Sequence, residues 1–125
     1  PDPNKDQMIV WYENTADREK AKWPVHLIKP GFRDAQAVMA GDIDNDGDID
    51  VVATSHRGPG KVAVMYNPGD PKQTDWPMQI LKNNWNSANC VVLADLNNDG
   101  KLDVVAGADR GSSEIRWWKN EGKSK

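Results

Sequence analysis

Two nine-residue stretches place carboxylates at a spacing that suits a hard metal cation. The first has aspartate at every second position, namely Asp42, Asp44, Asp46, Asp48 and Asp50. In a tightly curled loop the side chains at positions 1, 3, 5 and 9 can converge on one point, together with the backbone carbonyl of Asp48. Calcium takes about six to eight oxygen ligands, so we predict a calcium site here. Gly47 suits the turn, because glycine readily adopts positive φ.

The second stretch repeats the pattern with one change. Its predicted ligands are Asp95, Asn97, Asp99 and Asp103, with the backbone carbonyl of Lys101. An amide replaces one carboxylate, and ligand charge therefore predicts weaker binding than at the first loop. Sites of this kind in extracellular modules bind at about 10⁻⁴ to 10⁻³ M, which predicts two Ca²⁺ sites with a mainly structural role.

Other readings of these stretches are less favoured. An EF-hand begins with the same spacing but needs Glu at position 12, where this chain has Ala53 or Ala106. Two histidines and one cysteine, none at ligand spacing, do not suit zinc. A metal-free alternative stays open, in which Asp, Asn and Gly cap the turn by their own hydrogen bonds. Two copies in register favour the metal.

The two stretches belong to a longer repeat with a period near 53 residues. Trp23-Pro24 recurs as Trp76-Pro77, Phe32 as Trp85, Asp42 as Asp95, and Arg57-Gly58 as Arg110-Gly111. Such self-similarity is typical of repeat architectures. Short apolar runs separated by Gly, Pro, Asn and Asp predict strands, and no stretch has helical periodicity.

We therefore predict an all-β fold with four antiparallel strands per period. The strands are expected at residues 8–13, 23–29, 35–41, 49–55, 60–67, 76–82, 88–94, 102–108 and 113–119. Four short strands per repeat indicate β-propeller blades, with the calcium loop between the first and second strands. Residues 1–30 would form the last two strands of one blade, 31–82 a complete blade, and 83–125 three strands of the next.

This organisation predicts a segment of a longer propeller. A ring closed by several copies would set residues 8–13 of one copy against residues 113–119 of another for the same third-strand position. The remaining blades of the same propeller are therefore the expected partners, because terminal blades without neighbours expose apolar faces.

Composition excludes several classes of function. The 125 residues carry a net charge of −3, and eight of the nineteen acidic residues lie in the two Asp-rich stretches. No stripe of Lys and Arg suggests nucleic acid, and no apolar run approaches the roughly 18 residues of a membrane span. Cys90 has no partner for an internal disulfide, and its apolar neighbours predict a buried side chain.

The D-x-[DN]-x-D-G-x-x-D loop between apolar strands resembles the FG-GAP or VCBS repeats of integrin α subunits, fungal propeller lectins and microbial extracellular propellers. The Phe-Gly and Gly-Ala-Pro signatures are reduced here to Gly31-Phe32 and Arg57-Gly58-Pro59. The segments Tyr66–Pro71 and Trp76-Pro77 look closer to the microbial members, where such propellers stand alone or are attached to enzyme domains, including sugar lyases. The resemblance implies an extracellular or secreted protein, with the periplasm or cell surface as options.

The resemblance also implies that calcium loops lie on one face and that ligands bind on the opposite face or between blades. The opposite loops are residues 30–35, 55–60, 83–88 and 108–113. Their candidate ligand-binding residues are Phe32, Arg33, His56, Arg57, Trp85, Asn86, Asp109 and Arg110. Aromatic and hydrogen-bonding groups suit a sugar, and paired Arg suits a carboxylate or phosphate. Phe32 and Trp85 share a register, which favours packing between blades over ligand contact.

Three functions remain open at this stage. One is a lectin-like binding module for glycans or protein partners. Another is the propeller part of a larger secreted enzyme, such as a sugar lyase. A third is an architectural repeat of a surface assembly. The chain has no nucleophile and base at a telling spacing and no phosphate loop, so catalysis by this segment is not favoured.

Overall fold

The computed structural model describes residues 7–16, 23–57 and 59–122, and every regular element in these ranges is a β-strand. The strands are β1 (Met8–Tyr12), β2 (Val25–Pro30), β3 (Ala35–Gly41), β4 (Asp50–Ser55), β5 (Lys61–Met65), β6 (Met78–Lys82), β7 (Ala88–Ala94), β8 (Asp103–Ala108) and β9 (Glu114–Trp118). The prediction of an all-β chain is confirmed, and predicted strand ends differ from these bounds by at most two residues. Residues 1–6 and 17–22 of the first predicted unit, Gly58 of the second and residues 123–125 of the last lie outside the described residues.

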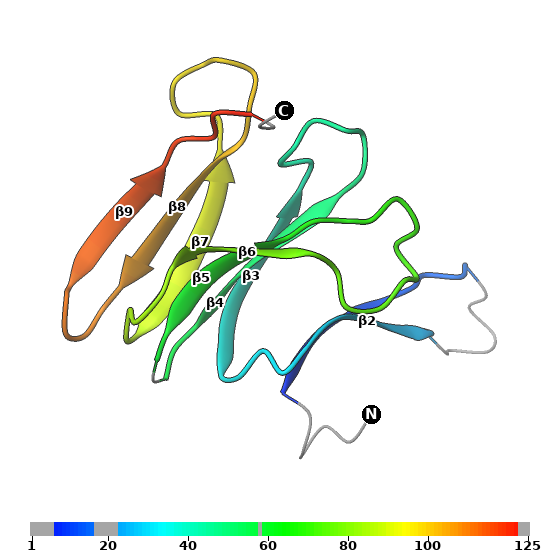
Figure 1. Cartoon of the computed structure of the whole chain (residues 1–125), viewed down its shortest axis with the longest axis horizontal. Helices are drawn as coiled ribbons and strands as arrows, with labels where there is room; N and C mark the ends of the chain where they lie inside the picture. Colours follow the sequence, from blue (N-terminus) through cyan, green and yellow to red (C-terminus); the bar gives the residue numbers. More distant parts are fainter. Residues whose placement is uncertain (1–6, 17–22, 58, 123–125) are drawn as a thin grey trace.

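The strands form three antiparallel sheets (Figure 1). The first sheet contains β1 and β2, the second has the order β3-β4-β5-β6, and the third has the order β7-β8-β9. Within each sheet consecutive strands pair with one another, which is the meander expected when short turns join antiparallel strands. Among the described residues no helix could cross a membrane.

The sequence repeat is reproduced in the pairing registers. Val51 lies opposite Met65 in the second sheet, and Val104 lies opposite Trp118 in the third, one period later. The irregularities recur as well: a register shift follows Ala35 in β3 and Ala88 in β7. A bulge bends a strand and increases its twist. Equal bulges at equivalent positions therefore give the two sheets the same curvature, which lets them stack.

Two hydrophobic clusters join the sheets to one another. One lies between the first and second sheets and includes Ile28, Phe32, Val51, Met65 and Trp76. The other lies between the second and third sheets and includes Val64, Trp85, Val91, Val104 and Ala106. The second sheet contacts a neighbouring sheet on each face, and all six residues of its β4 strand are buried. Strands buried on both faces are continuously apolar, as β4 is in Val51, Val52 and Ala53.

The outward face of the third sheet has no described neighbour. Ile115 is 80% exposed, and Val92 and Trp117 are about half exposed. Cys90 lies opposite Gly107, which lies opposite Ile115, and the thiol is exposed. The prediction of a buried Cys90 is therefore wrong, because alternation along β7 turns this residue away from the second sheet.

Candidate functional site

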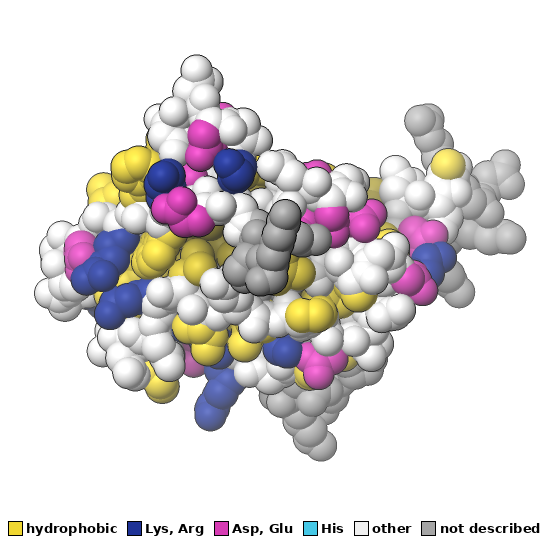
Figure 2. All heavy atoms as spheres, turned by 45° about the horizontal axis from the view of Figure 1, so that its top comes forward, with side chains coloured by type: hydrophobic (Ala, Val, Ile, Leu, Met, Phe, Trp, Pro, Cys, Tyr) yellow, Lys and Arg dark blue, Asp and Glu magenta, His cyan; other side chains and the backbone are white. Residues whose placement is uncertain are grey.

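The two Asp-rich stretches form equivalent loops at one end of the sheets (Figure 1). One joins β3 to β4 and the other joins β7 to β8, so each lies between the first and second strands of its sheet, as predicted. In Figure 2, which brings this end forward, acidic side chains lie at the surface with hydrophobic side chains exposed beside them.

The first loop brings three carboxylates together. Asp42, Asp44 and Asp50 each offer an oxygen, and these oxygens lie within 4.8 Å of one another. Asp46, the fourth predicted side-chain ligand, does not belong to this group, and its Oδ1 accepts a hydrogen bond from the backbone N–H of Asp48 at 2.9 Å. Three carboxylates at such separations repel one another unless a cation lies between them, and an all-oxygen donor set suits a hard cation such as calcium.

A backbone turn gives both loops their shape. The Asp42 carboxylate accepts hydrogen bonds from the N–H groups of Asp46 and Gly47 at 3.1 and 2.9 Å. In the second loop Asp95 accepts the same bonds from Asp99 and Gly100 at 3.1 and 2.8 Å. Gly47 has a φ of 92°, which only glycine adopts without strain. Each turn therefore closes through its own hydrogen bonds. This is the self-capping that the metal-free alternative predicts for the shape of the loop.

The aspartate at position 9 of each loop links the loop to the hairpin through hydrogen bonds, and we call this link the staple. Asp50 is fully buried; its Oδ2 accepts the Ile43 N–H and its Oδ1 accepts the Asn67 N–H, both at 2.9 Å. Asp103 is also fully buried and accepts the equivalent bonds from Leu96 at 3.0 Å and Asn120 at 2.8 Å. Each carboxylate thus ties the loop to the end of the third strand of its sheet.

Two asparagines complete this staple, and the sequence interpretation gave them no role. The Asn67 amide donates to the Ile49 carbonyl at 3.2 Å, and the Asn120 amide donates to the Leu102 carbonyl at 3.0 Å. Asn120 also donates to the Ile43 carbonyl at 2.6 Å, which joins the third sheet to the first loop. Both asparagines recur after an aromatic or apolar segment in the repeat, and this recurrence is the signal that could have identified them.

Burial and neighbouring charges both raise the pKa of two groups at the first loop. Desolvation raises the pKa of the Asp50 carboxyl, and the Asp44 carboxylate acts in the same direction, against the hydrogen bonds from Asn67 and Ile43. Burial also raises the pKa of the Tyr66 phenol, with the charges of Asp50 and Asp44 adding to it. A cation beside Asp50 would favour its charged form and offset the cost of its burial.

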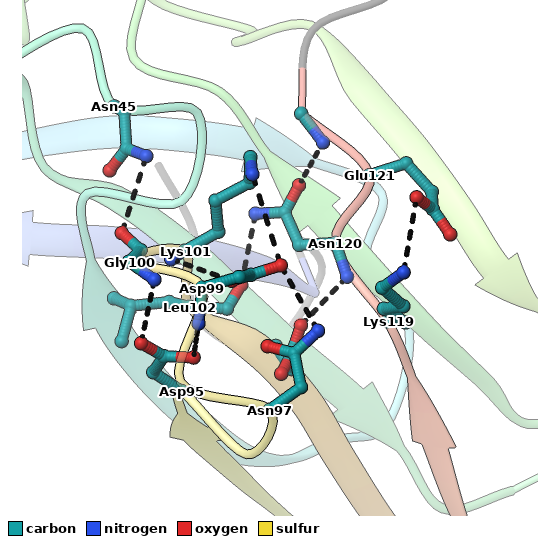
Figure 3. Close-up of polar contacts among 12 residues, drawn as sticks. Asn45, Asp95, Asn97, Asp99, Gly100, Lys101, Leu102, Lys119, Asn120 and Glu121 are labelled. Atoms are coloured by element: carbon teal, nitrogen blue, oxygen red, sulfur yellow. Dashed lines mark hydrogen bonds and ion pairs between the residues drawn. The ribbon is translucent and has the colours of Figure 1, made fainter.

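The second loop has a different arrangement of side chains (Figure 3). The Asn97 amide donates to Asp99 Oδ2 at 3.0 Å, and Lys101 Nζ lies 3.8 Å from the same oxygen. The backbone N–H of Lys101 lowers the pKa of Asp99 by donating to the carboxylate, and Asn97 and the Lys101 charge add to this. Two of the predicted ligands, Asn97 and Asp99, thus already contact each other, and the Lys101 ammonium lies beside Asp99.

The opposite end of the sheets is held by a line of backbone hydrogen bonds. His56 donates its N–H to the Asp34 carbonyl at 2.9 Å, Ser87 donates to the His56 carbonyl at 2.7 Å, and Asp109 donates to the Ser87 carbonyl at 3.4 Å. Asp34 and Ser87 are equivalent in the repeat, and both have positive φ. Loops from the second and third sheets are therefore fixed against one another at this end.

The predicted ligand-binding residues divide into two groups. Arg33, Arg57, Asn86, Asp109 and Arg110 are exposed at this end, and His56 is half-buried. Phe32 is 1% exposed and Trp85 3% exposed, and each belongs to a hydrophobic cluster. The prediction that these two rings contact a ligand is therefore corrected, because their burial leaves no ring face for a sugar. Both rings pack between sheets instead.

Two neighbouring antiparallel sheets with one register, each with an acidic loop between its first two strands, define a β-repeat protein. Consistent with this, a family model described as the FG-GAP-like repeat matches residues 42–106, and one described as the FG-GAP repeat matches residues 91–122. The chain belongs to the FG-GAP-like repeat family, whose repeats imply a propeller. Comparison with curated proteins and with solved structures found no match.

Proposed function

We propose that the chain is a calcium-stabilised segment of an extracellular β-propeller that binds glycans or protein partners through the face opposite its calcium loops. The observation that carries the calcium part is the convergence of Asp42, Asp44 and Asp50 in a member of the FG-GAP-like repeat family. In this proposal residues 1–30, 31–82 and 83–125 are parts of three consecutive blades.

The residues of the first loop fit calcium better than those of the second. Asp42, Asp44 and Asp50 would hold the ion, with Asp46 and the Asp48 carbonyl as further ligands. In the second loop the candidates are Asp95, Asn97, Asp99, Asp103 and the Lys101 carbonyl, but Asn97 and Lys101 already contact Asp99. A bound calcium would supply a charge-neutralising crosslink between loop and strand, and would stabilise the folded chain by mass action.

Calcium is expected to bind and to stabilise the protein. With a Kd of about 10⁻⁴ M at the first loop, about 10 mM calcium raises the free energy of unfolding by about 2.7 kcal/mol. Asp44→Asn removes most of this increment, whereas Glu114→Gln, which lies away from both loops, leaves it intact. Calorimetric titration and urea unfolding in calcium and in EDTA measure both effects. No heat of binding and no stabilisation of the unaltered chain would contradict the calcium proposal.

The binding part of the proposal rests on the exposed polar groups of the opposite face. Arg57 and Arg110 lie in equivalent turns of neighbouring sheets, and the backbone bonds between His56, Ser87 and Asp109 fix those turns. Two guanidinium groups on a rigid surface suit a carboxylate-bearing partner, because arginine binds carboxylates in a bidentate manner.

Binding of acidic glycans should therefore depend on these arginines. On an array of neutral and carboxylate-bearing glycans, the double variant Arg57→Ala, Arg110→Ala should lose at least about tenfold in affinity for the acidic set. The double variant Lys72→Ala, Lys119→Ala, at exposed positions away from these turns, is the matched loss of two positive charges and should bind as the unaltered chain does. Equal loss from both variants would indicate a general charge effect and contradict the assignment of the face.

A further inference from the structure

The first loop is held by the third sheet as well as by its own. Asn120, two residues after β9, donates its side-chain amide to the Ile43 carbonyl at 2.6 Å and to the Leu102 carbonyl at 3.0 Å. Its side-chain oxygen accepts the Gly122 N–H at 2.9 Å, which fixes the orientation of the amide. Ile43 lies between two of the three converging aspartates, so a residue of the third sheet reaches the middle of the acidic group in the second.

The backbone of Ile43 is held on both sides. Its N–H donates to Asp50 Oδ2 at 2.9 Å, and its carbonyl accepts the Asn120 amide. Its side chain is 5% exposed and belongs to the cluster between the second and third sheets. The Asp44 N–H also donates to Asp50 Oδ2, at 3.4 Å. The segment that carries two of the three carboxylates is therefore fixed between the staple of its own sheet and an amide of the next sheet.

Two further contacts set the first loop against the second. A Cβ atom on Gly41, the last residue of β3, would lie 2.9 Å from Leu102 Cδ1 and 3.1 Å from Leu93 Cδ1, so the absence of a side chain lets these leucines approach. The Asn45 amide donates to the Gly100 carbonyl at 3.5 Å, the longest distance for a hydrogen bond (Figure 3). The third sheet thus contacts the first loop at its start, at Ile43 and at its turn.

The Ile43 contact of Asn120 is not needed for the staple. The equivalent residue one repeat earlier, Asn67, donates its amide to the Ile49 carbonyl of its own sheet at 3.2 Å. Asn120 makes the same contact with Leu102 and adds the bond to Ile43. One amide therefore closes the staple of the third sheet and reaches the loop of the second.

These bonds act on a group of carboxylates that would otherwise separate. The oxygens of Asp42, Asp44 and Asp50 lie within 4.8 Å of one another, where like charges repel. A backbone held at Ile43 keeps the side chains close before any ion binds. Such pre-organisation raises affinity, because the ion does not have to reorder the loop. Partners that orient metal ligands typically contribute about tenfold or more to metal affinity.

We infer, on the basis of the calcium function proposed above, that Asn120 is a positioning residue for calcium at the first loop. It supplies no ligand atom to the ion, and it holds residues 42–44 in the binding conformation through the Ile43 carbonyl. The first site is therefore completed by the neighbouring sheet. Because coupling is reciprocal, calcium at the first loop should also strengthen the junction between the second and third sheets.

Calorimetric titration with calcium tests this inference in a chain that carries Asp99→Asn, which weakens the second loop without removing its turn or its staple. In that background Asn120→Ala should bind calcium at least about tenfold more weakly. Asn83→Ala is the matched control, since it makes the same chemical change at an exposed position beyond the far end of β6 and should leave the affinity unchanged. Affinities that agree within about twofold in Asn120→Ala and its background would overturn the inference.

The side-chain amide NMR signal of Asn120 gives a second measurement that does not depend on the folding of Asn120→Ala. In the Asp99→Asn chain this signal should shift as calcium saturates the first loop, and adding Asp44→Asn should abolish the shift. A signal that stays unchanged at saturation would overturn the inference. The absence of any heat of binding in the unaltered chain would overturn the calcium proposal and this inference together, whereas binding without the Asn120 effects would overturn this inference alone.

Discussion

Replacing Gly60 by alanine is expected to cost about 3 kcal/mol of the free energy of unfolding. A Cβ atom at this position would lie 2.1 Å from the Trp85 carbonyl oxygen and 2.8 Å from the Ser55 carbonyl oxygen. Both contacts are with backbone, so no side-chain rotation can relieve them. The Gly60 carbonyl also accepts the Trp85 N–H at 2.9 Å, which makes this close approach part of the junction between the second and third sheets.

Urea unfolding followed by circular dichroism and by tryptophan fluorescence measures this cost. Gly107→Ala is the matched control, because the one close contact of its added Cβ would be with the Cys90 sulfur, at 2.8 Å, and that exposed side chain can move aside. Its next contacts, with Ile115 at 3.7 Å and the Glu114 carbonyl oxygen at 3.9 Å, are ordinary packing distances. The control should lose less than about 1 kcal/mol. Equal losses in the two variants would show that the backbone contact at Gly60 is not what limits the substitution.

The strands could be predicted because local sequence specifies them. Apolar runs such as Asp50–Ser55 are bounded by glycine, proline and asparagine, and the repeat supplied two or more copies of most elements. Pairing by consecutive antiparallel neighbours follows from short turns. The acidic loops were visible for the same reason, since their ligand spacing is a property of nine consecutive residues.

Contacts between sheets could not be predicted in the same way. The clash that requires glycine at position 60 depends on the backbone of Trp85, which is 25 residues away in the sequence. The exposure of Cys90 depends on which face of β7 meets the second sheet, and an apolar neighbourhood gives no sign of that choice. Phe32 and Trp85 could be assigned to packing because they share a register, but their burial required the neighbouring sheet.

Asp50→Ala is expected to cost about 3 kcal/mol even in EDTA. The carboxylate is fully buried and accepts three backbone N–H groups, from Ile43 and Asn67 at 2.9 Å and from Asp44 at 3.4 Å. Its removal leaves these donors without that partner next to the β3–β4 hairpin. An unsatisfied buried donor costs about 1–3 kcal/mol. Removing the buried charge offsets part of this loss of stability, because burial raises the pKa of Asp50 and so makes its ionised form costly.

Measuring unfolding in EDTA and in calcium separates the two roles of the first loop. Asp44→Ala should change stability in EDTA by less than about 1 kcal/mol and should lose the calcium-dependent increment, because Asp44 lies in the carboxylate group without forming the staple. Asp103→Ala should repeat the loss of Asp50→Ala in EDTA, since Leu96 and Asn120 donate to it in the same way. If Asp50→Ala lost stability only when calcium was present, Asp50 would be a ligand alone. The staple holds the hairpin in either state, so the calcium site would be built onto a loop that is already folded.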